Sequence, residues 1–60
     1  MNKQKIEFNK KSIDKEVHVL SLGKRGKIVD VKDEETFLVL VDNGELNEIK
    51  EIDIFDIRYV

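Results

Sequence analysis

The sequence predicts a small all-β domain, and three observations support this prediction. Nearly every apolar side chain is bulky and most favour strands, since the 60 residues include seven Ile, seven Val and five Leu but no Ala. Apolar and polar residues alternate over short runs, which is the period of a strand with one buried face. Turn signals, most of them containing glycine, separate these runs. A chain of this length forms one domain with a small core, because it buries only about 60% of its unfolded surface.

The chain begins with a polar lead-in. Residues 1–12 are rich in lysine and are expected to be partly disordered, ahead of a folded domain over residues 13–60. A first strand is predicted over residues 15–22, where Val17 and Val19 alternate with polar residues.

Two glycines, Gly23 and Gly26, bracket the predicted first turn. The strand after it, over residues 27–31, needs a bulge or bend, because Ile28 and Val31 have opposite parity and one face cannot take both. A small barrel needs such a bend to close.

The most apolar run, residues 36–41, is predicted as the central strand. An Asn-Gly pair follows it, which is a strong hairpin signal because both residues tolerate positive φ. The fourth strand must therefore return at once. A three-residue loop over residues 43–45 would set Ile49 opposite Val39, and we favour it over a two-residue loop, which would set Glu48 opposite Val39 and bring a charge to the core.

The C-terminal residues allow two interpretations. Ile52 and Ile54 share one parity while Phe55 and Ile57 share the other, which a short 3₁₀ turn between two strands explains. A helix over residues 45–55 is the competing interpretation, because good helix formers are frequent there. With the first interpretation, five short strands joined by tight turns, with a 3₁₀ turn before the last, describe a small bent SH3-like barrel.

Composition narrows the classes of function. The chain has no cysteine, so neither disulfides nor thiolate metal sites support the core, and we expect a cytoplasmic protein. No apolar run approaches the roughly 20 residues of a membrane span, so we expect no membrane contact. Residues 1–27 carry a net charge of +5 and residues 28–60 one of −7. This split predicts a positive face for a polyanion, unless the strands interleave the two signs.

Two stretches resemble known sequences. VHVLSLGKRGKIVDVKDEETFLVLVDNG, residues 17–44, resembles the KOW motif of ribosomal and transcription-elongation proteins, with Gly26 at the place of the motif's glycine. DKEVHVLSLGKRGKIVDV, residues 14–31, is similar to the SH3-like segment that precedes the Smr domain in the bacterial MutS-like paralogue family. That family usually has Gly-Asp where this chain has Asp14-Lys15, so the turn that enters the first strand is expected to differ.

The resemblance implies a KOW-like or Tudor-type barrel in a small bacterial or phage protein. It implies contact with nucleic acid or a ribonucleoprotein but no catalysis, because the nuclease and ATPase domains of that family are not covered. Fold alone does not determine such a function, which depends on a site.

We therefore expect a non-enzymatic module that binds nucleic acid or a ribonucleoprotein through its basic loop. Glycine lets phosphate oxygens approach the backbone, and the cations beside it neutralise them. The predicted nucleic-acid-binding residues are Gly23, Lys24, Arg25, Gly26, Lys27 and Lys15. The partner is then the phosphate backbone of RNA or DNA. An ordinary solvated turn is the other interpretation of these lysines, since no aromatic stacking platform is interleaved with them.

A small protein-interaction adaptor or inhibitor is the second hypothesis. Leu38 and Leu40 are expected to face outward from the central strand, beside Glu48 and Lys50, unless Ile6 or Phe8 of the lead-in covers them. The C-terminal half adds an acidic face. A protein partner would then dock on these four residues, and the chain would be a monomer or a weak homodimer.

Other chemistry finds little support in the residues. His18 is the only histidine and has no Ser, Cys or second His to work with. The carboxylates lack the spacing of a calcium loop, and no His/Cys pair fits zinc. We predict no catalytic residue, no metal ligand and no cofactor.

Overall fold

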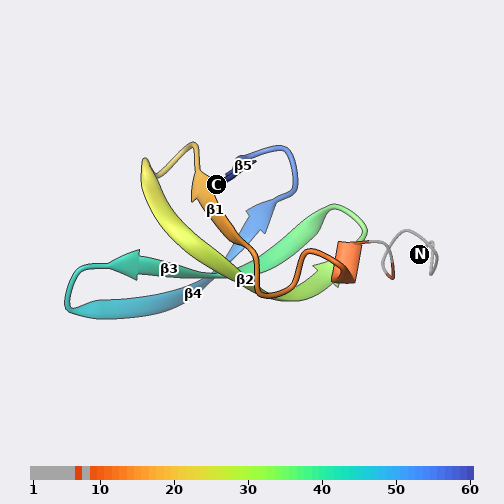
Figure 1. Cartoon of the computed structure of the whole chain (residues 1–60), viewed down its shortest axis with the longest axis horizontal. Helices are drawn as coiled ribbons and strands as arrows, with labels where there is room; N and C mark the ends of the chain where they lie inside the picture. The colour runs from red at the N-terminus through yellow and green to blue at the C-terminus, as the bar shows by residue number, and fades with distance from the viewer. Residues whose placement is uncertain (1–6, 8) are drawn as a thin grey trace.

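The structure is a computed structural model that describes residue 7 and residues 9–60, and it is all-β (Figure 1). The strands are β1 (Glu16–Val19), β2 (Lys24–Asp33), β3 (Thr36–Asn43), β4 (Leu46–Asp53) and β5 (Ile57–Tyr59). They form one antiparallel sheet in the order β4-β3-β2-β1-β5. The predicted all-β class and its five strands are confirmed. Closure into a barrel is not, because β4 and β5 form the two edges and do not pair with each other in the described part of the chain.

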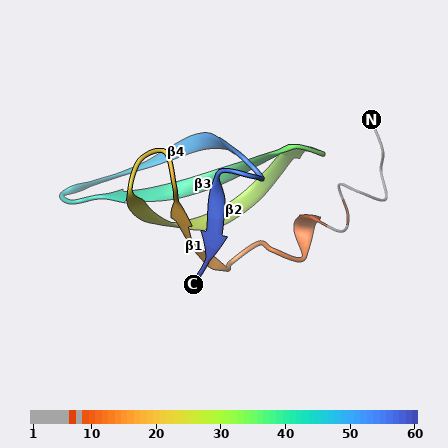
Figure 2. The same cartoon turned by 90° about the horizontal axis from the view of Figure 1, so that it is seen from above.

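The sheet is long and strongly bent. The molecule has principal extents of 35 × 17 × 16 Å, and the hairpin of β3 and β4 extends well beyond β1 and β5 (Figure 1). Seen from above, β1 and β5 run at a steep angle to β3 and β4 (Figure 2). The long strand β2 pairs with both β1 and β3, so it carries the chain through this change of direction.

The first turn lies earlier than the sequence predicted. β1 ends at Val19, the four residues Leu20 to Gly23 form the turn, and β2 pairs with β1 from Lys24 onward. Gly23 has a φ of 63°, which favours glycine, and its N–H donates to the Val19 carbonyl at 2.9 Å. The prediction of a turn between Gly23 and Gly26 is therefore wrong, and the basic residues lie in a strand.

The predicted bend in β2 is confirmed. The pairing of β2 with β3 shifts register between Ile28 and Asp30, and Ile28 and Val31 are both buried as a result. At this irregularity, the Asp30 carboxylate accepts the N–H of Val31 at 2.8 Å.

The core lies on one face of the sheet. Its buried apolar residues are Val17, Val19, Ile28, Val31, Phe37, Val39, Val41 and Ile52. Gly26 of β2 is also buried, because the backbone of β3 and the side chain of Val39 lie against it. A Cβ there would come within 2.6 Å of Val39 Cγ1 and 3.0 Å of the Leu40 carbonyl oxygen. Close approach, rather than an unusual φ, is what requires glycine at this position.

The register between β3 and β4 differs from both predicted alternatives. The loop consists of Gly44 and Glu45, and Val39 pairs with Lys50. Gly44 takes a φ of 80° at the first loop position, as in a type II′ turn. A shift of one residue reverses the faces of a strand. The predicted core residue Ile49 is therefore 62% exposed.

β4 rules out the helical alternative for residues 45–55, since these residues are a strand up to Asp53. A single turn then leads to β5. In this turn, the Asp56 N–H donates to the Asp53 carbonyl at 2.9 Å. This is the bond expected of a 3₁₀ turn, but the turn does not extend into a longer 3₁₀ segment.

Three strands end in the same local motif. Asp33, Asp42 and Asp53 each accept, through the carboxylate, the backbone N–H two residues later, at 2.9, 3.2 and 2.8 Å. These Asx turns stop β2, β3 and β4 and start the reversal of the chain.

The described end of the lead-in packs against the domain. Asn9 and Lys10 lie in a short helical turn (Figure 1), and Asn9 is only 8% exposed. Its Nδ2 donates to the Glu34 carbonyl at 3.1 Å. This contact ties Asn9 to the turn between β2 and β3.

Candidate binding face

The sheet face opposite the core is exposed, and we call it the outer face. It carries Glu16 and His18 of β1, Arg25, Lys27 and Asp30 of β2, Thr36, Leu38, Leu40 and Asp42 of β3, Asn47, Ile49, Glu51 and Asp53 of β4, and Arg58 of β5. These residues share a face because successive side chains along a strand point to opposite faces, and the residues between them point to the face that carries the core.

Three basic residues form a row across the outer face. His18 pairs with Arg25 on one side and with Arg58 on the other, so the three residues lie on adjacent strands β2, β1 and β5. The Cβ atoms of residues directly opposite each other on one sheet face lie about 5 Å apart. Lys27 follows two residues after Arg25 on the same face. We call Arg58, His18 and Arg25 the basic row.

The predicted basic loop does not gather its cations in one place. Lys24 lies on the face opposite Arg25 and Lys27, and its Nζ is bonded to Asn43 Oδ1. The Nζ of Lys15 lies 5.8 Å from the ring centroid of Tyr59, as a cation–π pair. Of the predicted residues, Arg25 and Lys27 share the outer face.

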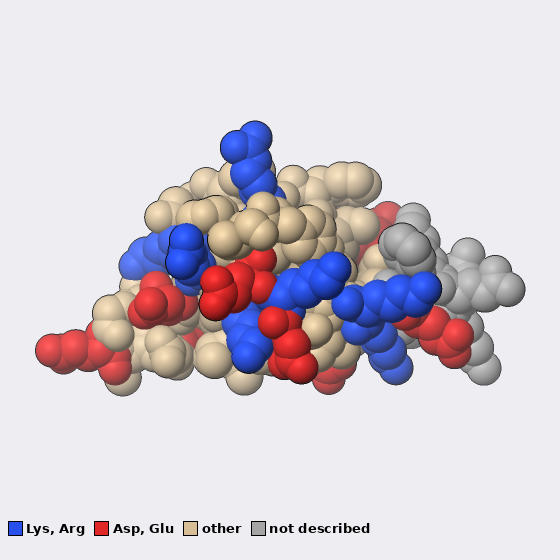
Figure 3. Space-filling model, in the orientation of Figure 1, with Lys and Arg blue, Asp and Glu red and all other residues tan. Residues whose placement is uncertain are grey.

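The acidic residues of the outer face lie beside the basic ones. Glu16 pairs with Lys27, whose Nζ also lies 3.9 Å from Asp14 Oδ1. An open depression is lined by Glu16, Arg25, Gly26, Lys27, Leu40, Asp42, Gly44 and Asn47. Figure 3 shows acidic and basic side chains side by side on the face it displays, so the charge split along the chain does not give a uniformly basic face.

The predicted protein-interaction residues divide between two faces. Leu38 and Leu40 face outward, as predicted, but they are half-buried rather than exposed. Their neighbours on β4 are Glu51 and Ile49, whereas Glu48 and Lys50 point to the other face, where their side chains lie 3.7 Å apart. The predicted set of four is therefore not one surface. The lead-in residues expected as a cover, 6 and 8, lie outside the described residues.

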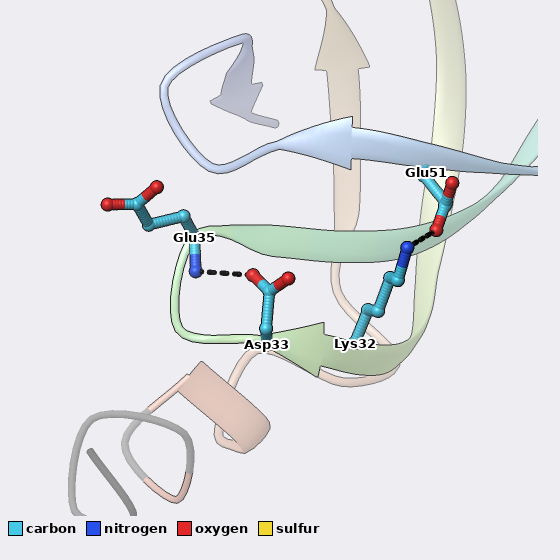
Figure 4. A network of polar contacts seen from close by, with 4 residues as sticks. All are labelled: Lys32, Asp33, Glu35 and Glu51. Atoms are coloured by element: carbon cyan, nitrogen blue, oxygen red, sulfur yellow. Dashed lines mark hydrogen bonds and ion pairs between the residues drawn. The ribbon is translucent and has the colours of Figure 1, made fainter. Parts of the chain in front are cut away.

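A polar contact crosses β3 near Leu38. The Lys32 Nζ is paired with Glu51 of β4, so its alkyl chain passes over β3 (Figure 4). The hydrogen bond to Glu51, and its charge, raise the pKa of Lys32 above the usual value. Beside it, the backbone N–H of Glu35 donates to the Asp33 carboxylate and lowers its pKa.

A second exposed apolar group lies where two turns meet. Asp56 holds the turns together, because its carboxylate accepts the Ser21 N–H at 3.0 Å and its carbonyl accepts the Leu20 N–H at 2.9 Å. Phe55 is 82% exposed, and Leu20 and Leu22 are also exposed. Sequence reasoning missed this group, although an exposed Phe in an Asp-rich turn is a usable signal.

Sequence reasoning also missed Arg58, which belongs to the basic row through the pairing of β1 with β5. No local pattern signals this pairing, since Arg58 and His18 are far apart in the chain. Within residues 9–60 and residue 7, no cluster of three His, Cys, Asp or Glu residues is placed to hold a metal ion. No helix of the described chain is long and apolar enough to cross a membrane.

The comparisons with known proteins found no matching family and no significantly similar curated protein or solved structure.

Proposed function

We propose that this chain is a non-enzymatic module that binds the phosphate backbone of nucleic acid on the outer face of its sheet. The observation that carries the proposal is the basic row, in which register brings Arg25, His18 and Arg58 together from three adjacent strands. Lys27 extends the row along β2. Arg25 and Arg58 lie on the two strands that flank β1 in one sheet, where their guanidinium groups can meet phosphate oxygens together.

The fold and the sequence add support. β1 lies between β2 and β5, and β2 bends at a bulge, which are features of small SH3-like barrels, so we propose that this open sheet is a relative of that fold. The resemblance of residues 17–44 to the KOW motif points to the same class of partner. The proposed site differs from the predicted loop, because Arg58 and His18 take the places of Lys15 and Lys24.

The expected binding is weak and strongly dependent on salt. Phosphate contacts from Arg25, Arg58 and Lys27 give a slope of log K against log salt of about −0.9 per contact on duplex DNA and about −0.7 on a single strand. Glu16 and Asp42 border the site and limit the number of contacts. No aromatic side chain lies among the residues of the outer face, so base stacking contributes little.

A titration of labelled single-stranded RNA and duplex DNA at several salt concentrations tests this proposal. The double variant Arg25→Glu/Arg58→Glu should abolish binding at low salt. The matched control is Lys10→Glu/Lys24→Glu, which changes the net charge equally but leaves the basic row intact. The control should keep at least about half of the affinity, because Lys24 points to the face opposite Arg25 and Lys10 lies in the lead-in.

Two results would contradict the proposal. One is the absence of binding by the unmodified protein at low salt. The other is an equal loss of affinity in the two double variants, which would show that net charge alone determines the binding.

A polypeptide-binding adaptor is the second candidate, favoured by one observation. Leu38, Leu40 and Ile49 form an apolar strip on the outer face, and the strip borders the depression that contains Glu16 and Arg25. A protein captured from a nuclease-treated lysate, released by Leu40→Lys and retained by Arg25→Glu/Arg58→Glu, would support this function over nucleic-acid binding.

A further inference from the structure

β4 is an edge strand with a free side. It is eight residues long, and its residues from Leu46 to Glu51 are all exposed. Only β3 pairs with it in the described part of the chain. An edge of this length offers a row of backbone donors and acceptors to another strand.

The hydrogen-bond pattern between β3 and β4 determines which residues of β4 have free backbone N–H and C=O groups. The two-residue loop makes Asn43 and Leu46 the first hydrogen-bonded pair, and such pairs alternate along an antiparallel ladder. The Ile54 N–H donates to the Glu35 carbonyl at 2.9 Å, which continues the same phase at the other end. The even-numbered residues of β4 therefore bond to β3. Asn47, Ile49 and Glu51 turn their N–H and C=O groups toward the free side.

We propose that β4 pairs with β4 of a second copy of this chain, antiparallel, with Ile49 opposite Ile49. Only registers that pair odd-numbered with odd-numbered residues match the free backbone groups of both copies. The register centred on Ile49 also sets Glu48 of each copy opposite Lys50 of the other. It places Leu46, which is 69% exposed, opposite Ile52.

Charge selects this register over its neighbours. A shift that centres the pair on Glu48 sets two glutamates opposite each other, and a shift that centres it on Lys50 does the same with two lysines. Directly opposed like charges destabilise a strand pair. In the proposed register, Glu48 and Lys50 of the two copies form a square. Each charge in this square has neighbours of the opposite sign.

Charged residues on an edge strand often serve to prevent pairing. A protective pattern repels any incoming strand, whereas the centre of β4, from Glu48 to Lys50, is complementary to itself. Like charges meet only at the ends of the pair, where Asp53 lies opposite Glu45 of the turn. The apolar residues point the same way, because Ile49 is 62% exposed and continues a row that starts at Leu40. A second copy would extend this row across both hairpins.

The symmetry of the pair places the outer faces of both copies on the same side. Paired residues of adjacent strands share a face, so the two-fold axis is perpendicular to the sheet. The contact is one strand pair, which is smaller than the roughly 1,200–2,000 Å² typical of stable complexes, so the dimer should be weak and should depend on concentration.

Charge reversal of β4 tests the pairing. Sedimentation equilibrium should show that the mass of the unmodified chain rises from monomer toward dimer as the concentration increases. Glu48→Lys and Lys50→Glu alone should each weaken dimerisation by about tenfold or more, since each sets like charges opposite each other in two places. An equimolar mixture of the two variants should restore it, because β4 of the Glu48→Lys copy carries two lysines that would then meet the two glutamates of the Lys50→Glu copy.

The control is Glu35→Lys, which has the same charge change as Glu48→Lys but lies in the turn between β2 and β3, and it should dimerise like the unmodified chain. The double variant Glu48→Lys/Lys50→Glu keeps self-complementarity and should also dimerise. The proposal is wrong if the unmodified chain stays monomeric at the highest soluble concentration. It is also wrong if each single variant dimerises as strongly as the unmodified chain. A mixture of the two variants that fails to restore dimerisation would contradict it too.

Discussion

β2 and β4 are strands of similar length that have very different surroundings. β2 pairs on both sides and buries Gly26, Ile28 and Val31, whereas β4 pairs on one side and buries Ile52 alone among its residues. Both strands contain isoleucine and several charges, so composition does not explain the contrast. Its cause is position in the sheet. Stability is therefore concentrated around β2, and β4 keeps exposed residues that are available for contacts.

The largest expected effect comes from removing the same side chain in both strands. Ile28→Ala should lower the free energy of unfolding by about 2–5 kcal/mol, because it leaves a cavity at a fully buried site. Ile49→Ala should change it by less than about 0.5 kcal/mol at concentrations where the chain is monomeric. Urea unfolding followed by circular dichroism measures both.

If Ile28→Ala does not fold, Ile28→Val provides the same comparison at about 0.5–1.5 kcal/mol. Equal effects at the two positions would show that the distal hairpin of β3 and β4 contributes to stability as much as the core does.

Gly26→Ala is the second way to disturb β2, with an expected loss of about 1–3 kcal/mol from overpacking against Val39 and the β3 backbone. The control is Gly44→Ala in the turn before β4, where no heavy atom lies within 4 Å but φ is 80°. That variant should cost about 1 kcal/mol from conformational strain alone. A loss at Gly26 that is no larger than the loss at Gly44 would show that β3 yields easily to the added methyl.

Much of this contrast could be predicted from the sequence, because it depends on local alternation. The opposite parity of Ile28 and Val31 correctly predicted the bulge in β2, and Val17 and Val19 correctly marked the buried face of β1. The alternation of these residues indicates which face of the strand is buried, and it does so independently of the strand that pairs with it.

The register of β4 and the membership of the basic row could not be predicted. An Asn-Gly-Glu sequence fits several loops, and the choice of Gly44 and Glu45 reverses every side chain of β4. Arg58 reaches His18 only through the pairing of β1 with β5, which is a long-range contact. The Asx turns at Asp33, Asp42 and Asp53 were a missed signal, since each aspartate stands two residues before the N–H that it binds.

A smaller effect is expected at the entrance to β1, where Asp14 extends the contact with β2. Its N–H donates to the Ile28 carbonyl at 2.7 Å, while its φ of 74° is unfavourable for a residue with a Cβ. Asp14→Gly should raise the free energy of unfolding by about 0.5–1 kcal/mol, because relief of this strain outweighs an exposed ion pair with Lys27.

Asp14→Ala serves as the control, since it removes the carboxylate but keeps a Cβ, and it should not stabilise the protein. If both variants shift the urea midpoint equally, the charge of Asp14 rather than its backbone conformation determines the change.

The smallest expected effect concerns the end of β2, where the Asx turn of Asp33 depends on pH. The Glu35 N–H donates to the Asp33 carboxylate and lowers its folded pKa below the usual value of 3.8 (Figure 4). A lowered pKa means that this contribution to stability is complete above the unfolded pKa and is lost as pH falls through the folded pKa. The unmodified protein should therefore lose it below about pH 4.

Asp33→Asn isolates this effect, because the amide oxygen can still accept the Glu35 N–H but does not titrate. Urea midpoints of the two proteins should differ by a constant amount above about pH 5 and converge as the pH falls toward about 2. The difference should be small, since Asp33 is accessible to water. A difference that stays constant down to about pH 2 would mean that the carboxylate charge does not stabilise this turn, and that the end of β2 depends on backbone pairing alone.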